Sequence, residues 1–140
     1  MGRFFSGQKG QSVVELALVL PILLLLLLCI MEGGRIFAGY VELQSAARDG
    51  ARYASVYKDK TGTDIKDYVK TRLSLLNPAT LDESSGGVSN FQYLKQTTTD
   101  KKESWVELTL KYPMEITTPI ISVLIGNPFN LQVKMVMRSE

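Results

Sequence analysis

The sequence predicts an α+β protein: a long N-terminal membrane-spanning helix, then a small domain with a second helix and a roughly three-stranded antiparallel sheet. Three observations support this fold class. An apolar run interrupted only by Glu15 covers residues 13–31, apolar residues recur at helical spacing over 35–57, and three later segments alternate apolar with polar residues. We expect a leader over 1–10, a long helix over 11–57 and a small α+β domain over 58–140.

The apolar run over residues 13–31 has the length of a membrane span. No charged residue occurs from Leu16 to Met31, and six leucines follow one another at 23–28. At about 1.5 Å per residue the run is roughly 28 Å long as a helix, close to the hydrocarbon core of a bilayer. A soluble domain rarely holds a helix that is apolar on every face for so long. A cleaved secretory signal is a weak rival, because no small-x-small cleavage site follows the run.

The charges that flank the run leave its orientation nearly undecided. Arg3 and Lys9 precede it, while Arg35 and Arg48 follow within reach. The positive-inside count is therefore a tie, and the residues only mildly favour a cytoplasmic N-terminus.

Glu15 places a carboxylate near the start of the run, and two interpretations are open. It can lie among the lipid headgroups, where the helix N-terminal dipole favours an anion. Alternatively it has a partner inside the membrane. If the chain were cut after Gly10, the new amine of Gln11 would lie one turn away, on the same chain or on a neighbour. Such pairing would neutralise both charges and set the axial register of packed subunits.

Two further features of the long helix concern packing. Pro21 should kink it, either harmlessly or where neighbouring helices cover the freed carbonyl. Beyond Gly33-Gly34, which mark the membrane exit, small residues at Ala46, Gly50 and Ala54 form an i, i+4, i+8 row. This row would let another backbone approach closely, or it seats the protein's own sheet.

The remaining chain predicts one helix and three strands. The helix is expected over Asp64–Leu76 with Thr63 as its cap, followed by an exposed loop over residues 81–90. Strands are expected over residues 91–97, 105–112 and 129–137. The apolar segment 116–125 can be a short helix or a covering loop, and Trp105 faces away from the alternating apolar residues, toward a loop or a neighbouring subunit.

Composition argues against an enzyme and against nucleic-acid binding. Histidine is absent, and the only cysteine, Cys29, lies in the apolar run, so we expect no disulfide, metal site, cofactor or catalytic residue. The loop over 81–90 lacks phosphate-loop spacing. From Glu32 onward 14 Lys/Arg face 13 Asp/Glu without clustering, which gives no basic patch for a nucleic acid.

The segment from Gly10 to Ser55 resembles the N-terminal region of TadE-like minor pilins, which are pseudopilins of tight-adherence pilus systems within the type IV pilin-like group. The resemblance rests on a glycine, a glutamate five residues later, an ALVLP core, an E-x-G-R exit and an A-A-R-x-G-A-R stretch. These motifs occupy Gly10, Glu15, residues 17–21, Glu32 with Gly34-Arg35, and residues 46–52. Leu16 stands where the family often has phenylalanine.

The resemblance implies a structural protein of pilus assembly. A prepilin peptidase would cut after Gly10, leaving Gln11 first and Glu15 fifth, with the N-terminus cytoplasmic and the 58–140 domain outside the inner membrane. Its partners would be that peptidase, other pilin or pseudopilin subunits, the pilus secretion machinery and membrane lipid. The rival is an unprocessed single-pass anchor that displays a binding or scaffold domain for a secretion or adhesion complex.

Overall fold

The computed structural model describes residues 7–57, 59–85, 87–97 and 104–139. It has the predicted α+β fold: a long apolar helix, a second helix and a three-stranded antiparallel sheet. Most of the predicted leader, residues 1–6, and residues 98–103 between the first two predicted strands lie outside the described residues.

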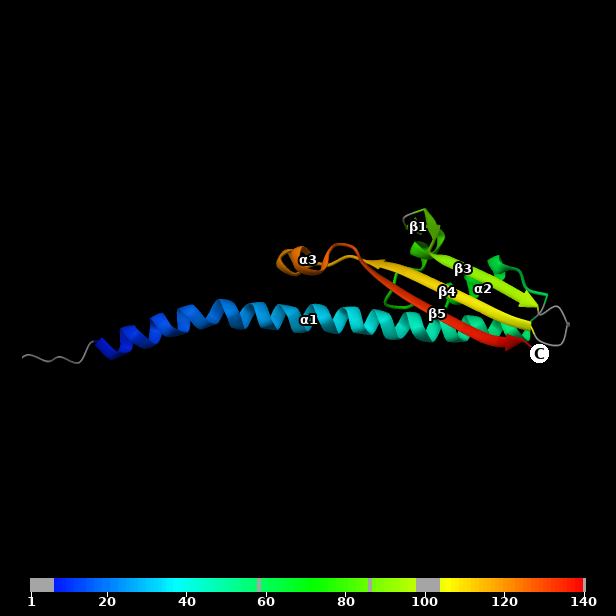
Figure 1. The fold of residues 1–140 in the computed structure, drawn as a ribbon. Helices are drawn as coiled ribbons and strands as arrows, with labels where there is room; N and C mark the ends of the chain where they lie inside the picture. Colours follow the sequence, from blue (N-terminus) through cyan, green and yellow to red (C-terminus); the bar gives the residue numbers. More distant parts are fainter. Residues whose placement is uncertain (1–6, 58, 86, 98–103, 140) are drawn as a thin grey trace, which may run out of the picture.

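Helix α1 spans Gly7–Val56 and is continuous over 50 residues. At 1.5 Å per residue it is about 75 Å long. It confirms the predicted helix over 11–57 and begins four residues earlier. Figure 1 shows that the blue N-terminal half extends away from the domain, whereas the cyan and green half lies along the sheet. One helix therefore has two environments.

The sheet has the strand order β3-β4-β5, from Phe91–Thr97, Ser104–Met114 and Phe129–Ser139. All neighbours are antiparallel, with Phe91 opposite Leu110 and Leu110 opposite Val133. The predicted strands are confirmed, and β4 and β5 each run a little further than expected. Because side chains alternate across a strand, Val106, Leu108 and Leu110 share one face, and each is fully buried.

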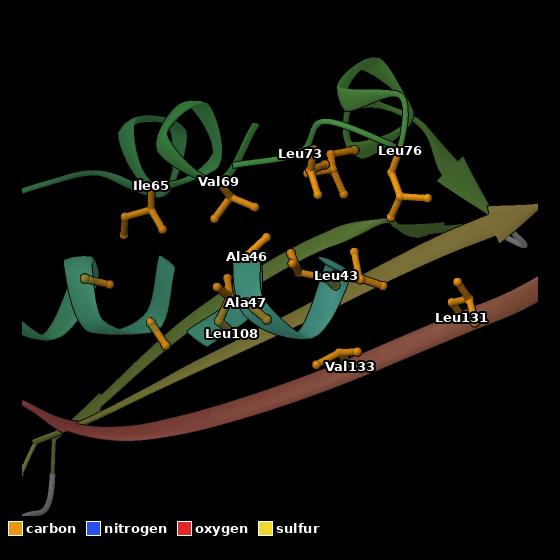
Figure 2. Close-up of a cluster of buried hydrophobic side chains, with 14 of the residues drawn as sticks. Leu43, Ala46, Ala47, Ile65, Val69, Leu73, Leu76, Leu108, Leu131 and Val133 are labelled. Carbon is orange, nitrogen blue, oxygen red and sulfur yellow. The ribbon is translucent and has the colours of Figure 1, made fainter. Parts of the chain in front are cut away.

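The core lies between that face, α1 and α2, which spans Gly62–Lys70. Figure 2 shows side chains from the three layers meeting, with Ile65 and Val69 of α2 above Ala46 and Ala47 of α1. The core residues contributed by α1 are mostly small: Leu43, Ala46, Ala47, Ala51 and Ala54. Small side chains allow a helix and a sheet to approach closely, so the domain wraps the end of α1.

Helix α2 differs from its prediction at both ends. Its cap is Thr61 rather than Thr63, in a capping box in which the Thr61 hydroxyl accepts from Asp64 N–H and the Thr61 N–H donates to the Asp64 carboxylate. The helix ends at Lys70, six residues before the predicted Leu76. Leu73 and Leu76 still reach the core, from the irregular segment that follows the helix.

Glu42 of α1 accounts for the early end of α2. Its carboxylate accepts N–H bonds from Ser74, Leu75 and Leu76, at 2.8 and 3.1 Å for Leu75 and 2.9 Å for Leu76, and a bond from the Ser74 hydroxyl. In a longer helix these amides would bond to carbonyls four residues earlier. A charged acceptor makes stronger hydrogen bonds than a carbonyl does, and it draws the chain back onto α1.

The segment predicted as an exposed loop over 81–90 is partly buried. It begins at the end of a 3₁₀ turn, η1, over Pro78–Asp82 and contains a hairpin of β1, Ser84–Ser85, with β2, Val88–Ser89. Leu81 and Asn90 are 0% and 1% exposed. The Asn90 amide donates to the Thr80 carbonyl at 2.8 Å, which ties the segment to β3. Most residues of this segment are polar, so the sequence did not indicate that Leu81 is buried and anchors it.

The undecided segment 116–125 contains a helix, α3, over Pro119–Ile125. It follows β4 and precedes β5, and Figure 1 shows it beyond the end of the sheet, on the side toward the N-terminus of α1. Only Ile121 among its apolar residues is buried.

Candidate functional site along the apolar helix

The first half of α1 is bare of protein contacts. Every residue from Gly10 to Met31 is exposed, although the run consists almost wholly of aliphatic side chains; Val13 is 66% and Ile22 69% exposed. Among the described residues α1 is the one helix long and apolar enough to cross a membrane, and its most apolar window has no part buried. Transfer of one such side chain out of water is worth about 1.5–3 kcal/mol, so this surface requires an apolar cover.

The predicted processing residues lie together at the start of this bare half. Gly10, Gln11 and Glu15 line one shallow hollow with Val14 and Leu18. A Cβ added at Gly10 would meet nothing within 4 Å. Within the side chains that the structure describes, Glu15 makes no ion pair, and it sits one turn from Gln11, as the spacing predicts. The peptide bond between Gly10 and Gln11 lies within α1 and carries no cover from the domain.

Pro21 lies inside α1, eleven residues beyond Gly10. The blue part of the helix is inclined to the remainder in Figure 1. A proline there removes one backbone hydrogen bond and clashes with the preceding turn, which is the usual cause of such a bend.

At Glu32, directly after the apolar run, the first contacts with the domain begin. Glu32 is only 6% exposed. Its carboxylate accepts from the Arg35 guanidinium, from the Thr117 N–H at 3.4 Å and from the Thr118 hydroxyl at 3.3 Å. Arg35 also donates to the carbonyl of Glu115. We call these residues, Glu32, Arg35 and 115–118, the exit cluster; it fastens the segment before α3 to α1.

The electrostatics of the exit cluster favour the ionised form of Glu32. The hydrogen bond from Arg35 lowers the pKa of Glu32 below its ordinary value, burial opposes this, and the Thr117 N–H adds to the lowering. Each oxygen of the buried carboxylate accepts at least one hydrogen bond, so the ionised group is partnered where it is buried. Sequence reasoning gave Glu32 and Arg35 only as family motif positions. Their i, i+3 spacing with opposite charges was the available signal.

The row of small residues, Ala46, Gly50 and Ala54, faces the chain's own domain. Ala46 and Ala54 are each 1% exposed and belong to the core. A Cβ added at Gly50 would lie 2.4 Å from Val69 Cγ2 and 2.9 Å from Leu108 Cδ2. The row thus seats α2 and β4, which was the alternative to contact with another chain.

A groove of about 800 Å³ lies between the exit cluster and the β1–β2 hairpin. It is lined by Arg35, Asn90 and Tyr112 together with the C-terminal end of β4 and the turn before β5. Asn90 Oδ1 is buried and has no hydrogen-bond partner among the described residues. No group of three or more His, Cys, Asp or Glu side chains that could hold a metal occurs in the described part of the chain.

Trp105 is 40% exposed on the face of the sheet opposite the core, as the alternation predicted. It pairs across the sheet with Gln96 and Arg138.

Comparison with known proteins gives one match. Residues 10–52 match the family model of TadE-like protein. The match covers the bare half of α1, the exit cluster residues Glu32 and Arg35, and the first part of the core face. It suggests a protein associated with a tight-adherence pilus and with the partners of such a system in general. Neither the comparison with curated proteins nor that with solved structures gave a match.

Proposed function

We propose that this chain is a structural subunit of a tight-adherence pilus system, a minor pilin of the TadE-like type and not an enzyme. A prepilin peptidase removes residues 1–10, Gln11 becomes the first residue, and α1 packs with the helices of other pilin or pseudopilin subunits. Before packing, α1 spans the cytoplasmic membrane with its N-terminus inside and the α+β domain outside.

The observation that carries the proposal is the division of α1 at Glu32. The chain's own domain covers one face of the helix from Glu32 onward and leaves all of Gly10–Met31 exposed. Such a surface is stable in lipid or against other apolar helices, and a pilin-like subunit needs both in turn. The match to the TadE-like model over 10–52 supports the same reading.

Processing is the sharpest test. The full chain is expressed in a bacterial inner membrane with a prepilin peptidase, and in parallel with the same peptidase inactivated. Intact mass of the extracted protein should show loss of residues 1–10 only with the active enzyme. A chain that retains Met1 beside an active peptidase would refute the proposal and favour the single-pass anchor.

Gly10→Val supplies a control variant for that experiment. Because a Cβ added at Gly10 would meet nothing within 4 Å, the substitution should leave the fold unchanged. Uncleaved chain in this variant, with an unchanged urea unfolding curve, would assign the loss of cleavage to peptidase recognition. Cleavage at the normal position in Gly10→Val would argue against Gly10 as the recognised residue.

Glu15 tests the packing role separately. In Glu15→Ala and Glu15→Gln, processing and membrane insertion should persist, since removing a charge from the span lowers the cost of insertion. Assembly into pilus structures should be lost in both, because neither retains a carboxylate to meet the Gln11 amine. If Glu15→Gln still assembles, the contact between residue 15 and the Gln11 amine is a hydrogen bond and not a charge pair.

The second candidate is an unprocessed membrane anchor that displays a binding or scaffold domain. The groove beside Asn90, with its buried unpartnered oxygen, is the observation that favours it. This candidate predicts that Asn90→Ala abolishes the function of the assembled system while mass analysis still finds Met1. A processed chain whose function tolerates Asn90→Ala would exclude it.

A further inference from the structure

Helix α3 carries an apolar surface that the domain does not cover. Its sequence, Pro-Ile-Ile-Ser-Val-Leu-Ile, holds no charge. Ile121 faces the chain and is 8% exposed, whereas the others point outward: Ile120 54%, Val123 85%, Leu124 74% and Ile125 48%. Ser122, the single polar side chain, donates its hydroxyl to the Pro119 carbonyl at 2.7 Å, so it needs no water. Four aliphatic side chains on one short helix form a contiguous patch.

The position of α3 along α1 is fixed by the exit cluster. Thr117 and Thr118, the residues just before α3, bond to the carboxylate of Glu32. Behind them, the Ile116 N–H donates to Asn127 Oδ1 at 3.1 Å, which closes the base of the α3 segment. Figure 1 shows α3 beyond the end of the sheet and toward the N-terminus of α1. Helix α3 therefore lies at the level at which the apolar run of α1 ends.

We propose that α3 is an interfacial helix, which lies in the outer surface of the lipid bilayer and seats the domain on the membrane while α1 spans it. This inference rests on the membrane-inserted state in the proposed function. It assigns to α3 a lipid contact and to the exit cluster the role of holding α3 at the correct depth.

Three features favour lipid over another protein as the occupant. The patch continues the apolar surface of the span, since it begins beside Glu32 where the bare half of α1 ends. Its side chains carry no charge, and the single hydroxyl, that of Ser122, already donates within the helix, so the patch offers aliphatic side chains to its partner. Its exposed aliphatic residues suit the boundary between headgroups and acyl chains, where burial of apolar area drives binding. Because α3 has no basic residue, zwitterionic lipid should suffice.

The test uses tryptophan placed at chosen depths in the full chain, reconstituted in phosphatidylcholine nanodiscs. Trp105, the only native tryptophan, is replaced by Trp105→Phe. Val123→Trp then reports α3, Leu24→Trp reports the span, and Val136→Trp is the matched control, an exposed aliphatic residue (53%) on β5. Along β5, Val136 lies about 23 Å from the end near α3. Brominated phosphatidylcholine quenches tryptophan that touches the acyl chains.

Quenching of Leu24→Trp and Val123→Trp, with unquenched Val136→Trp, is the expected result. Bromine placed near the headgroup should quench Val123→Trp more strongly, and bromine placed deep in the chain should quench Leu24→Trp more strongly. If Leu24→Trp is quenched while Val123→Trp emits like Val136→Trp, the inference is overturned. A Val123→Trp emission that is blue-shifted, insensitive to bromine and lost on dilution into more lipid would also overturn it, in favour of a second copy.

The same data separate this inference from the function on which it rests. If Leu24→Trp is not quenched, α1 does not span the bilayer, and both the proposed function and the placement of α3 in lipid are refuted. Failure of the peptidase to cleave after Gly10 would refute the pilin proposal and leave the placement of α3 in lipid untouched, because the full chain is inserted in either case.

Discussion

Gly50→Ala tests the closest helix contact in the domain. The added Cβ would lie 2.4 Å from Val69 Cγ2 and 2.9 Å from Leu108 Cδ2. Carbon atoms in contact lie about 3.5–4.0 Å apart, so Val69 must retreat by about 1 Å or more. Val69 is β-branched and fully buried, so its side chain cannot rotate away, and α2 as a whole has to move.

Two opposing effects set the size of the change. Alanine is a better helix former than glycine by about 1 kcal/mol, which stabilises α1. Overpacking of a filled core costs about 1–3 kcal/mol, and a contact of 2.4 Å between the new Cβ and Val69 should cost near the upper end of that range. The clash therefore wins, and we expect Gly50→Ala to lower the free energy of unfolding of the domain by about 1–2 kcal/mol.

The assay is urea unfolding of the full chain in detergent, followed by the fluorescence of Trp105 in β4. Gly34→Ala is the matched control, since it makes the same change in the same helix with nothing within 4 Å of the new Cβ. It should be neutral or stabilising by up to about 1 kcal/mol. The double variant Gly50→Ala/Val69→Ala should lose less than the sum of the single variants, because it removes the clashing methyl group. Full additivity, or a Gly50→Ala chain as stable as the wild type, would refute the packing of α1 on α2.

Three further predictions use the same unfolding assay. Glu42→Ala leaves the N–H groups of residues 74–76 without their acceptor and should cost about 2–4 kcal/mol, with Glu42→Gln between it and the wild type; an unchanged midpoint would contradict the bonds at Glu42. Glu32 has a pKa below the ordinary 4.5, so its stabilisation should be complete above that pH and fade as the pH falls through the folded-state pKa. The difference in urea unfolding midpoint between wild type and Glu32→Gln should accordingly be constant near neutral pH and shrink in acid. A difference that grows in acid would contradict the lowered pKa of Glu32. Glu107→Gln breaks the 2.7 Å bridge to Lys134 on the open sheet face and should change stability by less than about 1 kcal/mol, with a still smaller effect in high salt.

The sequence predicted those parts of the fold that depend on local periodicity. The apolar run and the helical spacing define α1, and alternation defines β4 and β5, because each signal lies within the element it describes. Glu42 could not be placed in this way, since its partners lie 32–34 residues further along the chain. Without it, the apolar spacing of Leu73 and Leu76 extended α2 beyond its true end.

The candidate site shows the same limit. Gly10, Gln11 and Glu15 lie along one helix, so their proximity follows from their spacing. Arg35 lies within a turn of Glu32, but the other two partners, Thr117 and Thr118, lie 85 and 86 positions away, and no pattern near Glu32 indicates them. For the same reason the segment 116–125 stayed undecided: Pro119 is typical both of a first helical turn and of a loop, and the exit cluster that holds it is a tertiary feature.

Strand β5 follows all other strands of the sheet in the sequence, so it is the last of them to be synthesised. Val133 of β5 packs in the same core as Leu43 of α1, although 90 residues separate them (133 − 43). At about 5–20 residues per second, a ribosome needs roughly 5–18 s to deliver the second after the first. We expect α1 to enter the bilayer during that interval, well before the domain can close. The face of α1 that packs in the core carries mainly alanine, so α1 exposes little hydrophobic area before β5 is synthesised. A pulse-chase protease assay should therefore find membrane-inserted chains before protease-resistant ones.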